Sequence, residues 1–143
     1  MDVIKESFKF LTSENGFSSM NCIYEGNIDV ALEMRHKKVT LTCCYDRVTK
    51  EFWSSLTYPN IHNSNIEHME VNPIYIVEAL TSKLIKCDSS TLKDQVLFYA
   101  QILKDNIDFI ISPNFSIIRK AVKLQNKQFR LKRSKNKKLN DYG

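Results

Sequence analysis

Two histidines and two glutamates lie close together in the sequence and could bind a metal ion. His62, Glu67, His68 and Glu70 fall within the asparagine-rich stretch 60–71. Imidazole and carboxylate groups are ordinary zinc ligands. A helix brings ligands together at i and i+4, whereas the two histidines are six positions apart in a stretch without periodicity. We therefore expect an exposed loop here, with no metal site and no cofactor.

The cysteines and glycines show no catalytic arrangement. The four cysteines are Cys22, Cys43, Cys44 and Cys87, and the chain has no Cys-x-x-Cys or Gly-x-Ser-x-Gly motif. Three scattered glycines cannot form a phosphate-binding loop. We expect no catalytic residues and a protein that is not an enzyme. Reduced thiols, together with the lack of an apolar run long enough to span a membrane, favour the cytoplasm and no membrane partner.

Acidic side chains are candidates for binding a basic partner. Asp29 and Glu33 are four residues apart in a stretch of alternating apolar and polar residues, so a strand would place them on one face. Glu67 and Glu70 follow in the stretch 60–71. We predict that these four carboxylates contact a protein partner. The alternative is an ordinary solvated sheet face.

Basic residues are concentrated near the C-terminus. Residues 119–138 hold ten lysines and arginines and no acid, which leaves 11 basic against 15 acidic residues in 1–118. Such a run can neutralise phosphates without reading base sequence, and Phe129 can stack on a base. The alternatives are a solvated tail, a tail folded onto the acidic body, and contact with an acidic protein or a membrane surface. The candidates for nucleic-acid binding are Arg119, Lys120, Lys123, Lys127, Arg130, Lys132 and Arg133.

The first half of the chain must position the acidic candidates. Ile4, Phe8 and Leu11 form one apolar stripe, which predicts a helix over 2–14 that stops at Asn15-Gly16. Four stretches then alternate between apolar and polar residues and are joined by short turns, a pattern typical of an antiparallel meander. These stretches are 20–24, 28–34, 39–45 and 52–58.

The second half is predicted to be helical after the loop at 60–71. Asn72-Pro73 is a cap followed by a first-turn proline, and Thr91 with Asp94 resembles a capping box. The stretch 92–110 keeps one helical face over about five turns. A last helix begins near Asn114, and we expect it to fray from Lys132 onward because little remains to be buried.

These elements predict an α+β fold. A four-stranded antiparallel meander sheet is packed on one face by an N-terminal helix and by C-terminal helices. We expect a single domain over 1–118 and a basic C-terminal helix or tail over 119–143. An uncovered sheet edge or the helix at 92–110 would also allow a homodimer.

The layout resembles a broad group of small bacterial α+β proteins that often lie beside toxin genes and are regarded as immunity-type proteins. The resemblance covers roughly residues 1–110, through Phe8-Lys9-Phe10-Leu11, the Gly16-Phe17 step and the meander. The basic stretch after Pro113 departs from this group. The resemblance implies a protein that neutralises a toxin or effector by covering its active surface. The basic arm suggests an alternative, a nucleic-acid-associated protein.

Overall fold

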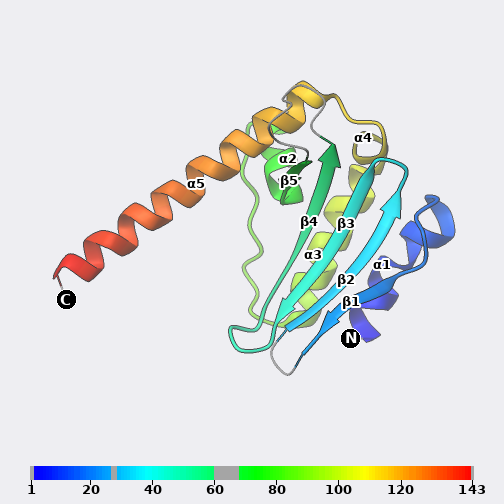
Figure 1. Ribbon diagram of the computed structural model, residues 1–143, viewed down its shortest axis with the longest axis horizontal. Helices are drawn as coiled ribbons and strands as arrows, with labels where there is room; N and C mark the ends of the chain where they lie inside the picture. Colours follow the sequence, from blue (N-terminus) through cyan, green and yellow to red (C-terminus); the bar gives the residue numbers. More distant parts are fainter. Residues whose placement is uncertain (1, 27–28, 60–67, 143) are drawn as a thin grey trace.

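The computed structural model describes residues 2–26, 29–59 and 68–142, and it describes side chains over 3–26, 29–59 and 69–135. A single antiparallel sheet has the strand order β1-β2-β3-β4-β5, so every strand pairs with its neighbour in the sequence (Figure 1). The strands are β1 (Asn21–Glu25), β2 (Asp29–His36), β3 (Val39–Asp46), β4 (Glu51–Pro59) and β5 (His68–Val71). The helices are α1 (Asp2–Glu14), α2 (Pro73–Thr81), α3 (Leu92–Asp105), α4 (Ile107–Ile111) and α5 (Phe115–Tyr142).

The predicted α+β class and the meander are confirmed, but the predicted number of strands is wrong. The fifth strand, β5, lies at the end of the stretch expected to be a loop. It pairs with the second half of β4, where Val71 is opposite Leu56 and Met69 is opposite Tyr58. All four of these side chains are buried. The sequence offers only two alternating apolar positions here, Met69 and Val71, which are too few to predict a strand. The strand is stabilised by its packing against β4.

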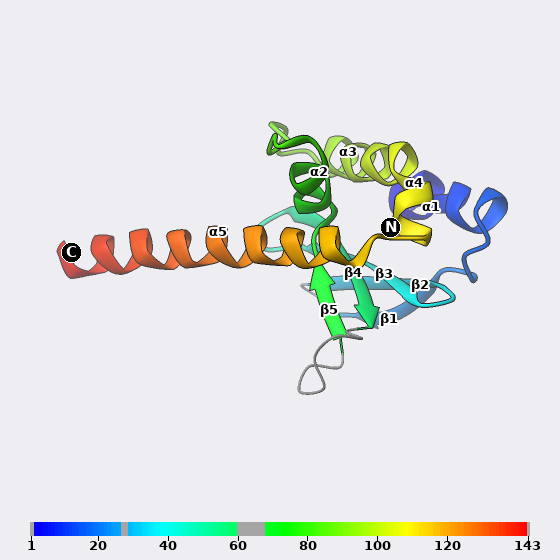
Figure 2. The ribbon, with the colours of Figure 1, turned by 90° about the horizontal axis from the view of Figure 1, so that it is seen from above.

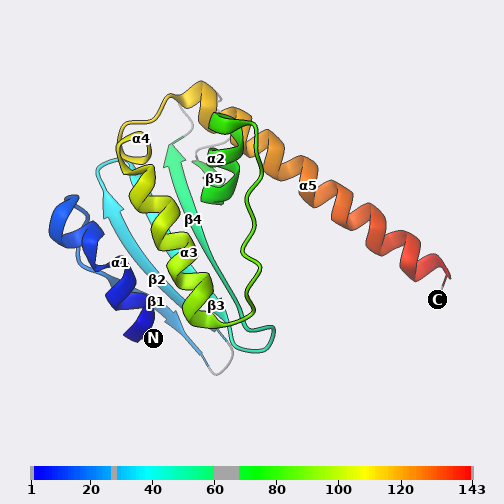
Figure 3. The ribbon, with the colours of Figure 1, turned by 180° about the vertical axis from the view of Figure 1, so that it is seen from behind.

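One face of the sheet forms the core with the helices. Alternate residues of β2 and β3, such as Leu32 and Leu41, are completely buried. The apolar stripe of α1, including Phe8 and Leu11, packs on this face. Figure 2 shows α1, α2, α3 and α4 on this side of the sheet, and Figure 3 shows α3 lying along the strands with α1 beside it.

The two predicted helix caps are confirmed, whereas the long helix over 92–110 is wrong. The Asn72 side chain accepts from the amide of Ile74, and the Thr91 hydroxyl accepts from the amide of Asp94. The chain breaks between α3 and α4 at Asn106, whose side-chain amide donates to the carbonyl of Ile102 at 2.8 Å. Asparagine can satisfy backbone groups by itself and so competes with the helix.

The last helix is longer than expected. Fraying from Lys132 onward is not observed, because α5 continues to Tyr142. Its first turns pack on α2 and β5, with Ile118 and Ala121 completely buried. Its remainder projects away from the sheet and the other helices (Figures 1 and 2). Its 28 residues correspond to a length of about 42 Å.

Candidate functional site

The sheet has a second face on which no described helix packs, and we call it the open sheet face (Figure 2). It consists of the residues of β2, β3 and β4 that alternate with the core residues, together with their neighbours on β1 and β5. Most of them are half-buried or exposed. A sheet face of this kind is free to contact another molecule.

An apolar row crosses the middle of the open sheet face. The strand register places Tyr24 opposite Ala31, Ala31 opposite Cys44, and Cys44 opposite Trp53. Tyr24 is 56% exposed and Trp53 is 37% exposed. Tyrosine and tryptophan are the residue types enriched at binding hot spots, since each buries a large apolar area and keeps one polar group.

An acidic row lies directly beside the apolar row. Asp29 is opposite Asp46, and Asp46 is opposite Glu51. The negative charge of nearby carboxylates affects the pKa of the Cys44 thiol. Burial raises its pKa, and the carboxylates of Glu70 and Asp29 raise that pKa further.

Three of the four acidic residues predicted to bind a partner lie on the open sheet face. Asp29 and Glu33 share one side of β2, and Glu70 of β5 is opposite Thr57 of β4. Glu67 lies outside the described residues. Two of the three already have a partner within the protein. Arg35 donates to Glu33 at 2.9 Å, and the Ser55 hydroxyl donates to Glu70 at 2.8 Å.

The sequence interpretation missed the apolar row and the other two members of the acidic row. Alternation within 52–58 places Trp53 on the face opposite Phe52, so this residue could be found from the sequence. Tyr24 could not, because the register of β1 shifts between Cys22 and Tyr24, and Asp46 and Glu51 lie just outside the predicted strands.

The basic residues of α5 fall into two groups. Arg119 and Lys120 lie next to the body of the protein, where they donate to the Ser116 hydroxyl at 3.3 Å and to the carbonyl of Ala79 at 3.5 Å. The other five predicted nucleic-acid-binding residues are exposed on α5, and all but Lys123 follow the last turn that contacts the body. These are Lys123, Lys127, Arg130, Lys132 and Arg133.

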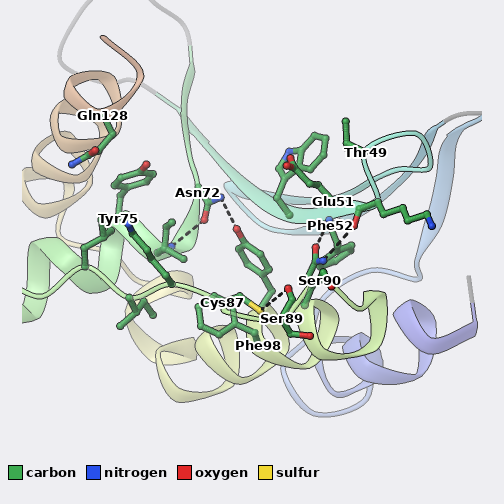
Figure 4. A pocket seen from close by; sticks show the side chains of 18 of the residues that line it. Thr49, Glu51, Phe52, Asn72, Tyr75, Cys87, Ser89, Ser90, Phe98 and Gln128 are labelled. Carbon is green, nitrogen blue, oxygen red and sulfur yellow. Dashed lines mark hydrogen bonds between the residues drawn. The ribbon is translucent and has the colours of Figure 1, made fainter. Parts of the chain in front are cut away.

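A groove of about 1050 Å³ lies beside the first half of β4, along the edge that β5 leaves unpaired (Figure 4). Its walls come from β4, α2, α3, α5 and the irregular segment 82–91. Three lysines and a single carboxylate, Glu51, are among the lining residues. The aromatic residues that line it are Phe52, Trp53, Tyr75, Phe98, Tyr99 and Phe129.

Two side-chain amides organise the interior of the groove (Figure 4). Gln95 accepts from the amide of Phe52 at 2.7 Å and donates to the carbonyl of Lys50 at 3.3 Å, so it satisfies the unpaired edge of β4. Asn72 donates to the hydroxyl of Tyr99 at 2.8 Å. Burial raises the pKa values of Tyr99 and Tyr75, so both hydroxyls keep their protons at neutral pH.

The groups considered for metal binding and catalysis are dispersed in the part of the chain that the structure describes. No set of three or more histidine, cysteine, aspartate or glutamate residues within that part could hold a metal ion. His62 and Glu67, and the side chain of His68, lie outside it. All four cysteines are free thiols. Among the described residues, no helix is both long and apolar enough to cross a membrane.

Comparisons with family models, with curated proteins and with solved structures found no match. A functional assignment therefore has to come from the surfaces described above.

Proposed function

We propose that this chain is a non-enzymatic binding protein of the immunity or inhibitor type, which neutralises a toxin or effector by covering its active surface. The observation that carries the proposal is the apolar row on the open sheet face, with Tyr24 and Trp53 exposed beside an acidic row. Protein interfaces commonly combine aromatic anchors with a charged rim.

The acidic row selects for a basic partner. Carboxylates at a rim accelerate the encounter with a positively charged surface and disfavour acidic competitors. Basic active surfaces are typical of proteins that act on nucleic acids. The open sheet face would occupy such a surface, and the apolar row would then exclude water from the centre of the contact.

Co-expression with the product of the neighbouring gene tests this function. We expect the neighbouring product to arrest growth and this protein to restore it through a stable complex. Tyr24→Ala should weaken the complex about 30-fold, as loss of a hot spot of about 2 kcal/mol does. Asp29→Lys should mainly slow association.

Leu97→Ala is the matched control for Tyr24→Ala. Leu97 is 47% exposed on α3, which packs against the opposite face of the sheet. It should leave the affinity unchanged. A harmless neighbouring product that forms no complex would contradict the proposal, as would wild-type affinity in the Tyr24→Ala and Asp29→Lys proteins.

A second candidate function, binding to nucleic acid, is favoured by a separate observation. The exposed basic residues are carried on a helix that stays regular to Tyr142 and projects from the body. Like charges at i and i+4, such as Lys123 and Lys127, destabilise a helix. A polyanion would relieve that repulsion and would release its own counterions on binding.

Charge reversal on α5 tests the second candidate. Lys123→Glu/Lys127→Glu should abolish most binding to a labelled oligonucleotide and lower the slope of log affinity against log salt by about 2. The control is Lys5→Glu/Lys9→Glu, which changes the same net charge at the same spacing on exposed positions of α1. Equal binding by the two double variants would contradict the assignment. Truncation at Ser112 is unsuitable, because it removes Ile118 and Ala121 from the core.

A further inference from the structure

We propose that the groove beside β4 binds the unpaired bases of a single-stranded nucleic acid whose phosphates follow α5. This inference rests on the second candidate function, binding to nucleic acid, and it assigns the strand class that α5 alone does not specify. It is carried by the aromatic lining of the groove, by its positive charge, which continues onto α5, and by two hydroxyl groups in its wall.

The aromatic lining offers surfaces on which bases can stack. Phe129 and Trp53 are 45% and 37% exposed, whereas Phe52, Tyr75 and Tyr99 are buried in the walls. Proteins that bind single strands use exposed aromatic rings in this way, because every base presents a π-face. Bases inside a duplex are stacked on each other and cannot reach rings set in a groove.

The charge of the groove suits phosphates. Lys50 comes from the turn between β3 and β4, Lys86 from the segment 82–91, and Lys132 from α5. The one opposing carboxylate among the lining residues is Glu51. Lys132 also belongs to the exposed basic residues of α5, so the groove and the basic helix form one continuous positive surface.

Two hydroxyls are placed to donate to base edges. The Tyr99 hydroxyl accepts from Asn72, and its proton has no acceptor among the described residues. Within the same described part of the chain, the Tyr75 hydroxyl has no hydrogen-bond partner and is open to solvent at the groove, although most of the Tyr75 side chain is buried. Base edges carry the carbonyl and ring-nitrogen acceptors that these protons lack.

The groove is less suited to an extended peptide or to a small molecule. A peptide that added to the free edge of β4 would need the amide of Phe52 and the carbonyl of Lys50, both of which Gln95 occupies. The volume of about 1050 Å³ is at the upper end for small-molecule pockets. An extended ligand that lies along α5 would fill more of this volume than a small molecule.

The test compares a single-stranded oligonucleotide of about 12 nucleotides with its duplex, using the full-length protein. We expect tighter binding of the single strand in fluorescence anisotropy. Trp53 is the one tryptophan of the chain and lies where the groove meets the open sheet face, so the single strand should quench its emission in the wild type and much less in Phe129→Ala. Phe129→Ala should weaken binding of the single strand about 5- to 150-fold, the loss expected for one stacked base.

Leu131→Ala is the matched control, because Leu131 is 48% exposed on α5 and does not line the groove. It should bind the single strand as the wild type does. Equal binding of single strand and duplex, with constant Trp53 emission and no effect of Phe129→Ala, would overturn the groove proposal and leave nucleic-acid binding by α5 intact. Failure of every oligonucleotide to bind would overturn both. Quenching of Trp53 by polyglutamate instead of the oligonucleotide would assign the groove to acidic peptides and overturn the proposal.

Discussion

Tyr58 connects the sheet to the helical layer through one buried hydrogen bond. Its hydroxyl donates to the carbonyl of Ile110 in α4 at 3.0 Å, and its ring meets Phe115 edge to face. Burial raises the pKa of Tyr58, so the hydroxyl remains a donor over the whole physiological range. A buried donor and acceptor that satisfy each other contribute modestly, but either one left alone is costly.

Tyr58→Phe should therefore lower the free energy of unfolding by about 1–2 kcal/mol, because the Ile110 carbonyl loses its partner while the ring still fills the core. Urea denaturation followed by circular dichroism measures this change. Tyr45→Phe is the control, since no hydrogen bond of the Tyr45 hydroxyl is found among the described residues. An unchanged midpoint in Tyr58→Phe would show that the bond contributes nothing.

The cysteines should differ sharply in reactivity. Cys22 is exposed on β1, whereas Cys43 is buried and its pKa is raised by that burial. The pKa of Cys44 is raised too, so at any given pH below that pKa it holds less thiolate than an ordinary thiol. Cys87 is half-buried, and its thiol donates to the carbonyl of Ser89, so we expect Cys22 to give the fastest phase in a titration with Ellman's reagent at pH 8, and Cys22→Ser to remove that phase. A fast phase that survives this substitution would contradict the assignment.

At the scale of elements, Gln125 fixes α5 to the rest of the protein. Its side chain accepts from the amide of Asn72 at 2.7 Å and donates to the carbonyl of Glu70 at 3.0 Å. One side-chain amide thus pairs with a backbone N–H and a backbone carbonyl at the junction between β5 and α2. Neither the sheet nor α2 provides a partner for these two groups.

Gln125→Ala should raise amide hydrogen exchange in β5 and in the first turns of α5, with a loss of stability of about 1–3 kcal/mol from the two stranded backbone groups. Exchange followed by mass spectrometry locates the effect. Asn126→Ala, at the exposed neighbouring position, should leave the exchange pattern unchanged. Unaltered exchange of β5 in Gln125→Ala would mean that apolar packing alone holds α5.

Elements with strong periodicity or distinct caps could be predicted from the sequence. α1 is found as expected, and Gly16 directly after it has a φ of 75°, a conformation that glycine adopts without strain. β5 could not be predicted because it depends on pairing with β4. The break at Asn106 has a local cause, the bond of its side chain to the Ile102 carbonyl, but it lies within a sequence that otherwise keeps a helical period.

The candidate sites also divide into those that a local sequence pattern predicts and those that only the tertiary structure reveals. The acidic residues on the open sheet face could be grouped from alternation, since the side-chain period of a strand is a local property. The groove could not, because Trp53, Tyr75 and Phe129 come from separate elements that only the tertiary structure brings together. The basic residues of α5 were visible as a run, but their projection from the body was not.

At the scale of the whole molecule, charge is separated between the body and α5. The repulsion among the ten basic residues of 119–138 is not balanced by any acid within that stretch of α5. Raising ionic strength from about 0.01 to 1 M shortens the screening length from about 30 to 3 Å. The stability of α5 should therefore depend strongly on salt concentration. The stability of α3 should depend on it much less, because α3 contains both lysines and aspartates.

We expect amide exchange over residues 126–135 to slow as salt is raised over this range, while exchange in α3 stays constant. Hydrogen-exchange mass spectrometry at several salt concentrations provides the measurement. Lys123→Glu/Lys127→Glu, which introduces opposite charges, should remove most of the dependence. A parallel response of α3 and α5 would indicate a general effect of salt on the fold instead.

The amide of Gln95 has a consequence for how copies of this protein behave toward one another. A meander has two unprotected margins, and here the β1 margin is short and interrupted by a bulge. On the other side of the sheet, β5 covers only the second half of β4, and the Gln95 side chain satisfies two backbone groups at the uncovered first half. By occupying two backbone groups of this free edge, Gln95 opposes edge-to-edge pairing between identical chains.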